Sequence, residues 1–229
     1  MTRNLHDADY WLHPPHYELS AKQLEQFTAL PSTKRVRDGW LKCPAAAPKW
    51  VYLDWLARTK GLLFHGSNRA DIEMLEPQKP NDNSPDEFSK RNAVFATDAP
   101  IWAMFFAITD RSQPGLRMLN SSFQVLDGGV LSESFHFFSV TNEVLKASAW
   151  RSGTLYLLPG ETFERQPVYR WRGEDILEHQ WASAVGVEPV AKVHVEPADF
   201  PFLSHVRGHD NAYVERRSAE EPYGFPWLE

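Results

Sequence analysis

The spacing of apolar residues predicts three main helices in the first half of the chain. One opens with the capping-box pattern Ser20-Ala-Lys-Gln23 and continues through Phe27. A second has Pro48 in its first turn and ends at Gly61, since proline suits the start of a helix and glycine its end. A third starts at Pro100, after a possible cap at Thr97 or Asp98, and carries mostly aromatic and small apolar residues.

Short apolar runs predict strands through the rest of the chain. The first covers 62–65 and is expected to break at Gly66-Ser67, and the second covers 92–97. A short helix at 142–147 interrupts the later strands, which are expected at 122–126, 135–140, 154–158, 178–183 and 188–195. Strands that do not alternate with helices favour an α+β fold over a doubly wound parallel sheet.

Composition narrows the class of protein. A chain of 229 residues with 42% hydrophobic residues can form one sizeable domain. Its net charge of −6 disfavours general binding to a nucleic-acid backbone. The chain has one cysteine, so no intrachain disulfide can form, and it shows neither a signal-peptide pattern nor an apolar run that could cross a membrane. We therefore expect a cytoplasmic protein without membrane association and, on the available spacing of ligands, without a metal site.

The most specific local pattern is Leu63-Phe64-His65-Gly66-Ser67, in which a histidine closes an apolar strand and a glycine follows at once. Glycine at a sheet rim allows a flat ligand to approach the main chain. Taken alone, such a histidine is more often a structural residue bonded to a neighbouring carbonyl. About 30 residues later, 92–97 leads directly into the aromatic helix that starts at Pro100.

The two segments, LLFHGS and NAVFATDAPIWAMFFA, together resemble the ADP-ribosyltransferase superfamily, in particular PARP-like and rifampin-modifying enzymes. The resemblance covers about 60 residues directly. It implies a split antiparallel β-sheet core with a few flanking helices, and NAD as the substrate. In this scheme 1–60 is a short helical or irregular segment packed on the core, 61–211 is the ADP-ribosyltransferase-like domain, and 212–229 is a charged, loosely packed tail.

The resemblance also implies roles for individual residues. His65 would bond a ribose hydroxyl of NAD, the Gly66 main chain would pair with the carboxamide, and Phe95 would stack on the nicotinamide ring. This requires the rings of His65 and Phe95 to face each other across one slot. The implied NAD-binding residues are His65, Gly66, Ser67, Arg69, Phe95 and Thr97.

The catalytic position departs from the family pattern. Bond cleavage between nicotinamide and ribose builds positive charge on the sugar, which a carboxylate stabilises. The third position of the family falls on Gln180 instead of glutamate, and Glu178 lies two residues earlier, where the period of a strand would put both side chains on one face. The expected catalytic residues are therefore Glu178 and Gln180, in a mono-ADP-ribosyltransferase.

Several alternatives stay open at this stage. The acceptor can be a protein, a small molecule or a nucleic-acid end. The domain can instead be a non-catalytic NAD- or ADP-ribose-binding module, of the kind found in toxin–antitoxin or phage-defence systems. An RNA 2′-phosphotransferase-like enzyme and an interaction protein with an unrelated α+β fold are further possibilities. Residues 77–92 are predicted to form a long loop that can act as a lid.

Overall fold

In the part of the chain that the structure describes, two β-sheets and five α-helices form an α+β fold, as the strand pattern predicted. The computed structural model describes residues 8–29, 39–80 and 85–228. The first sheet has the order β11-β6-β1-β2-β10-β7 and is antiparallel throughout. Its strands are β1 (Leu63–Ser67), β2 (Val94–Thr97), β6 (Gly153–Leu158), β7 (Glu164–Arg165), β10 (Gln180–Ser183) and β11 (Ala191–Val195).

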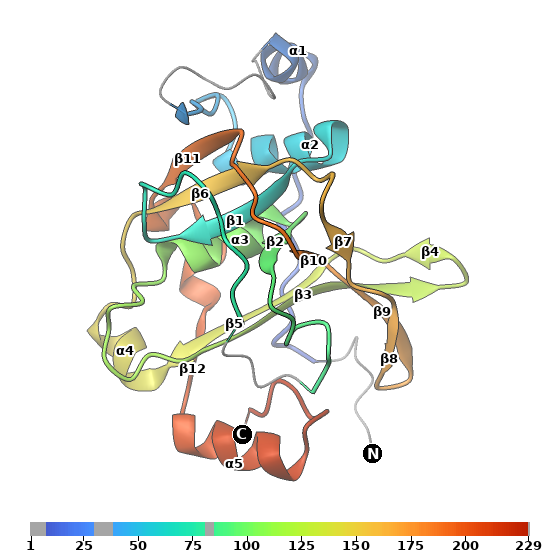
Figure 1. Ribbon diagram of the computed structural model, residues 1–229, viewed down its shortest axis with the longest axis vertical. Helices are drawn as coiled ribbons and strands as arrows, with labels where there is room; N and C mark the ends of the chain where they lie inside the picture. Colours follow the sequence, from blue (N-terminus) through green and yellow to red (C-terminus); the bar gives the residue numbers. More distant parts are fainter. Residues whose placement is uncertain (1–7, 30–38, 81–84, 229) are drawn as a thin grey trace.

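The second sheet has the order β12-β5-β3-β9-β8, with β4 paired to β3, and lies below the first in Figure 1. All its pairs are antiparallel except β12 with β5. Its strands are β3 (Met118–Asp127), β4 (Val130–Leu131), β5 (Phe135–Thr141), β8 (Tyr169–Trp171), β9 (Glu174–Glu178) and β12 (Arg207–His209). The helices are α1 (Ala21–Ala29), α2 (Lys49–Lys60), α3 (Pro100–Ile108), α4 (Asn142–Ala147) and α5 (Asn211–Glu220). None of these described helices has the length and apolar character needed to span a membrane.

Helix ends follow the local sequence signals. The Ser20 amide donates to Gln23 Oε1 over 2.9 Å, and the Gln23 amide donates to Ser20 Oγ over 3.3 Å, which completes the predicted capping box before α1. Gly61 closes α2 in the left-handed region at φ 63°, where glycine pays no steric penalty. Thr97 Oγ accepts from the Ala99 amide just ahead of α3.

Three sequence expectations are corrected. β1 does not break at Gly66-Ser67 but runs through both residues. The segment 178–183 is not one strand, because β9 ends in the second sheet at Glu178 and β10 begins in the first sheet at Gln180. The C-terminal tail is not loose: α5 is capped by the Asp210 side chain, and Trp227 is only 7% exposed.

Helix α3 lies between the sheets and is almost entirely buried. Of its nine residues only Phe106 is partly exposed. On one side its main chain rests on the glycines Gly66 of β1 and Gly153 of β6, where an added Cβ would lie 2.0 Å from the Ala103 carbonyl oxygen and 1.9 Å from that of Ala107, respectively. On the other side the Phe105 ring packs 4.8 Å from Phe138 of β5. The helix therefore couples the two sheets.

The outer face of each sheet has its own cover. On the first sheet, Leu63, Tyr156 and Ala96 form a cluster with Leu75 and Val187 from the connecting segments. On the second sheet, Ala8 and Trp11 from the N-terminal segment and Phe225 and Leu228 from the C-terminal end pack against the strand residues Phe123, Phe135 and Phe137. The ends of the described chain are thus part of the packed structure. Each sheet has an inner face toward α3 and an outer face covered by its own cluster.

A glycine-to-alanine change at the helix contact tests this packing. Because the alanine Cβ of Gly153→Ala would overlap the main chain of α3, we expect a loss of about 1–3 kcal/mol in the free energy of unfolding. Gly186→Ala is the control, since its nearest neighbours are the flexible side-chain ends of Glu76 and Met74. Urea unfolding measures both, and equal stabilities for the two variants would contradict the close contact.

Candidate functional site

His65 lies where β1 and β2 separate. The two strands pair only at Phe64 with Thr97. Beyond that pair the His65 Nδ1 approaches the Phe95 carbonyl oxygen to 2.8 Å, so Nδ1 carries the proton and donates it. This carbonyl bond is the contact expected of a structural histidine, and it leaves Nε2 as the acceptor of the ring.

The environment keeps this imidazole neutral. Burial lowers the pKa of His65, and the positive charge of Arg111 adds to that effect, although the bond to the Phe95 carbonyl opposes it. A neutral ring with Nδ1 protonated can accept a hydrogen bond at Nε2 from a hydroxyl group. The geometry is thus compatible with a hydroxyl-bearing ligand at the separation of the strands.

The main chain of Gly66 faces the same separation. Phe64 pairs with Thr97, and every second residue of a strand directs its amide and carbonyl to the same neighbouring strand. Gly66 therefore directs its polar groups toward β2, beyond the single paired position. Its missing side chain, however, serves the close approach of α3 and is not explained by a ligand.

The rings of His65 and Phe95 do not form the predicted slot. His65 lies two residues after Leu63 on β1, so the two side chains share one face of the strand. His65 also lies opposite Tyr156, which places it on the outer face of the first sheet. Phe95 lies between Val94 and Ala96, which belong to that same outer cluster, so its ring points to the α3 side. The expectation that one flat heterocycle sits between these two rings is corrected.

The remaining implied NAD-binding residues already have partners within the protein. Ser67 Oγ accepts from the Arg69 amide and so supports the turn after β1. The Arg69 guanidinium makes a two-point contact with Asp71 at 3.0 and 3.1 Å on the surface. Thr97 is buried, and its hydroxyl accepts from the Ala99 amide.

Glu178 and Gln180 do not share the face of one strand. Glu178 Oε1 accepts from Ser121 Oγ at 3.1 Å and Oε2 accepts from the Tyr169 hydroxyl at 3.3 Å, both within the second sheet. Gln180 pairs with Thr97 in the first sheet, and its amide donates to Ser89 Oγ over 3.1 Å. The prediction from strand period fails because the chain changes sheets at His179. Since Ser89 belongs to the predicted 77–92 loop, its bond to Gln180 holds part of that loop against β10. Residues 81–84 of the loop lie outside the described residues.

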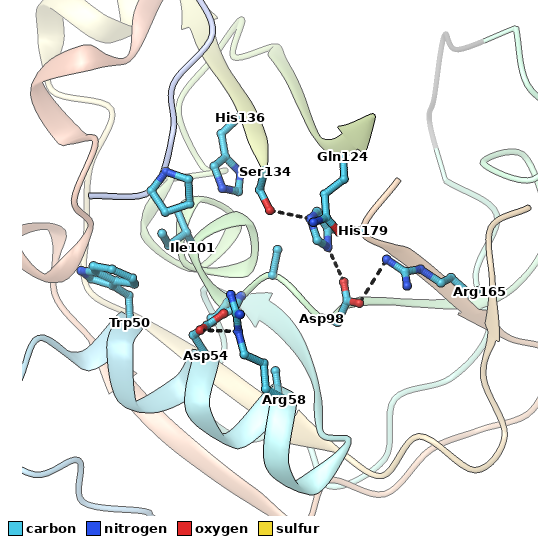
Figure 2. Close-up of a pocket in the computed structure, with 14 residues that line it drawn as sticks. Trp50, Asp54, Arg58, Asp98, Ile101, Gln124, Ser134, His136, Arg165 and His179 are labelled. Atoms are coloured by element: carbon cyan, nitrogen blue, oxygen red, sulfur yellow. Dashed lines mark hydrogen bonds and ion pairs between the residues drawn. The ribbon is translucent and has the colours of Figure 1, made fainter. Parts of the chain in front are cut away.

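A cavity of about 300 Å³ lies between the sheets at the start of α3. Its walls come from α2, from the segment that joins β2 to α3, from inward-facing positions of β3 and β5, and from the change of sheet at His179 (Figure 2). The lining residues are Pro14, Trp50, Asp54, Ala57, Arg58, Asp98, Ala99, Pro100, Ile101, Gln124, Ser134, His136, Arg165 and His179. This volume lies at the lower end of the range for small-molecule pockets, about 300–1,000 Å³.

A line of hydrogen bonds crosses one wall of this cavity. Ser134 Oγ lies 2.9 Å from His179 Nε2, and His179 Nδ1 lies 2.7 Å from Asp98 Oδ1 (Figure 2). The other oxygen of Asp98 lies 3.4 Å from the Arg165 guanidinium. Three segments that are distant in sequence thus bring a hydroxyl, an imidazole and a carboxylate into one connected series.

The two aspartates of the cavity have opposite shifts. Burial alone would raise the pKa of Asp98, but the hydrogen bond and charge of His179 and the charge of Arg165 outweigh it and lower the pKa. Burial raises the pKa of Asp54 against the opposing effect of Arg58, which lies 2.7 Å away. Asp98 is therefore ionised at neutral pH and can only accept, which requires the proton of His179 on Nδ1.

No local motif marks this series in the sequence. Asp98 fits the pattern of a helix cap, and His179 lies between the expected catalytic residues Glu178 and Gln180, so neither position points to a shared site. Ser134 has no glycine-rich surroundings of the kind that mark a nucleophilic serine. Only the change of sheet at His179 brings the three side chains together.

His136, on the wall of the cavity, gives a test of the electrostatics. Burial, and next the charges of His179 and His13, lower its pKa to about 3. In the unfolded chain its pKa is about 6.5, so the unfolded state gains a proton first as the pH falls. Its contribution to stability is therefore complete above pH about 6.5 and declines toward pH about 3, by up to about 1.4 kcal/mol per pH unit.

His136→Gln removes this titration. We expect the unfolding free energy of the variant to fall less steeply than that of the wild type between pH 6.5 and 4, as measured by urea denaturation. His16→Gln, at an exposed position, controls for the substitution itself. Parallel curves for wild type and His136→Gln would contradict a neutral buried His136.

Comparisons with known proteins returned no match: no family model, no curated protein and no solved structure is significantly similar to this chain.

Proposed function

We propose that the chain is an ADP-ribosyltransferase-like domain that binds NAD where β1 and β2 separate. The observation that supports the proposal best is the His65 imidazole, held by the Phe95 carbonyl over 2.8 Å beside the main chain of Gly66. In this position Nε2 accepts a bond from a ribose hydroxyl. The Gly66 amide and carbonyl form a donor–acceptor pair that matches a carboxamide.

Charge and burial favour this arrangement. The lowered pKa of His65 keeps the ring neutral, so that it can accept from a hydroxyl at physiological pH. Arg111 lies near enough to lower that pKa, and its guanidinium sits 5.5 Å above the Phe106 ring, so a positive charge is available near the strand ends. Phe95 contributes its carbonyl to the site, whereas its ring lies on the other face and has no stacking role in this proposal.

Glu178 is the carboxylate that the resemblance implies for catalysis, but it pairs with Phe123 on the outer face of the second sheet, whereas His65 lies on the outer face of the first sheet. Glu178 directly precedes the change of sheet, and Gln180 follows it at the start of β10, beside β2. Ser121 and Tyr169 orient the carboxylate of Glu178. Burial is the main reason that the pKa of Tyr169 is raised, and the charge of Glu178 raises it further. Transfer to a single acceptor, without chain elongation, therefore requires the ribose of NAD to reach Glu178 at the second sheet.

A second candidate is a module that binds NAD or ADP-ribose without turnover. The contact that favours it is the bond between the Gln180 amide and Ser89, which occupies the side chain at the third family position. Glutamine lacks the charge that would stabilise an oxocarbenium-like state. The two candidates differ in turnover but not in their need for His65.

His65→Ala tests the binding site shared by both candidates. Because it removes one hydrogen bond of about 1–3 kcal/mol, we expect NAD binding to weaken roughly ten- to a hundredfold in isothermal titration calorimetry. His194→Ala is the matched control, since His194 lies on β11 with a half-exposed side chain. No NAD binding by the wild type, or equal affinity in the two variants, would refute the site.

Glu178→Gln separates the transferase from the binding module. If the carboxylate stabilises the developing charge, nicotinamide release should fall on the order of a hundredfold while NAD affinity changes little. Release is followed by chromatography of labelled NAD, with Glu133→Gln as the control at an exposed site. NAD binding by a wild type that releases no nicotinamide would support the non-catalytic module instead.

A further inference from the structure

We infer that the cavity between the sheets is a second catalytic site, in which Ser134 is a nucleophile for the hydrolysis of small uncharged esters. This inference does not depend on NAD binding. It rests on two contacts shown in Figure 2: the Ser134 hydroxyl contacts the His179 imidazole, and this imidazole contacts the Asp98 carboxylate.

The proton positions follow from the carboxylate. Ionised Asp98 accepts from His179 Nδ1 over 2.7 Å, so the neutral form of the ring has its free lone pair on Nε2. Ser134 Oγ, 2.9 Å away, must then donate its proton to Nε2. This is the tautomer that a general base needs to activate a hydroxyl. Asp98 acts as a positioning residue, and the Arg165 guanidinium at 3.4 Å holds it in turn.

The support of each member makes the alignment rigid. The His179 amide donates to the Ser122 carbonyl over 2.8 Å, which fixes the change of sheet. His13 Nδ1 lies 3.2 Å from the Ser134 carbonyl oxygen, so the N-terminal segment supports the loop that carries the hydroxyl. Asp98 is held from two sides, by His179 and by Arg165.

The proposed hydrolysis needs only the ester, water and the side chains of the cavity. Ser134 Oγ attacks the carbonyl carbon of the ester while its proton moves to His179 Nε2. The alkoxide leaves with that proton, and an acyl-Ser134 remains. Water then attacks the acyl group, its proton moves to His179, and the carboxylic acid is released with Ser134 restored. Ile101 lines the same cavity within the first turn of α3, where the positive end of the helix dipole stabilises negative charge.

The walls indicate the class of substrate. Both guanidinium groups of the cavity are matched by carboxylates, Arg58 by Asp54 at 2.7 Å and Arg165 by Asp98 at 3.4 Å. No net charge is therefore left to bind an ionic group. Trp50, Pro100 and Ile101 supply apolar surface on the remaining side, and the volume of about 300 Å³ limits the ligand to a short acyl ester.

A fluorophosphonate probe tests the nucleophile directly. Serine attack on phosphorus expels fluoride and leaves a stable adduct, which peptide mass spectrometry locates on the full chain. We expect the adduct on Ser134 in the wild type, its loss in Ser134→Ala, and a labelling rate lower on the order of ten-thousandfold in Asp98→Asn, where the proton of His179 is no longer held on Nδ1. A slower rate at unchanged thermal stability separates this positioning role from a structural one.

Ser204 gives a matched control within the same chain. Its hydroxyl lies 3.3 Å from His205 Nδ1, but both residues are exposed, and no carboxylate contact to His205 is present in the described part of the chain. Ser204→Ala should leave labelling unchanged. His65→Ala should also label normally, and Ser134→Ala should bind NAD like the wild type, so a failure of the NAD proposal and a failure of this one are distinguishable.

Two outcomes would overturn the inference. One is a folded wild type that gains no adduct on Ser134. The other is hydrolysis of p-nitrophenyl acetate at the same rate by wild type, Ser134→Ala and His179→Ala, since the cavity would then contribute nothing to the reaction. The wild-type adduct map needs no variant, so the test stands even where a substitution impairs folding.

Discussion

The contact between the main chain of α3 and two glycines determines the arrangement of this protein. Gly66 and Gly153 sit on neighbouring strands of the first sheet, and neither leaves space for a side chain beneath the helix. The helix can therefore lie directly on the sheet while its other side packs Phe105 against Phe138 of the second sheet. Because the helix lies so close to the sheet, the position of its first turn is fixed, and that turn forms one wall of the cavity.

The same contact explains why the resemblance and the geometry agree only in part. The His-Gly-Ser pattern and the aromatic helix predict a ligand site, and the structure does bring the two segments together. Yet the glycine is needed for the helix, whether or not a ligand is bound. What remains available for a ligand is the separation of β1 from β2, with His65 held at its edge by the Phe95 carbonyl.

Local signals predicted most of the longer elements but not β7, β8, β12 or α5, and long-range geometry could not be predicted from them. Ser20 with Gln23, Gly61 after α2, and α4 at 142–147 depend on neighbouring residues, so the sequence was sufficient for them. The break between β9 and β10 depends on the pairing of Glu178 with Phe123 and of Gln180 with Thr97, which no local pattern encodes. Side chains alternate between the two faces within one strand, but this rule does not hold where the chain passes from one sheet to the other. The prediction that Glu178 and Gln180 share a face is wrong for this reason.

That change of sheet also accounts for the position of the cavity. His179 belongs to neither strand, and its amide is held by the second sheet while its ring reaches Asp98, which follows a strand of the first. A residue at such a junction contacts both sheets, so its neighbours come from segments that are far apart in sequence. Since Asp98 lies two residues before the start of α3, the helix that joins the sheets also positions the carboxylate. A hydroxyl, an imidazole and a carboxylate therefore meet there as a consequence of the fold.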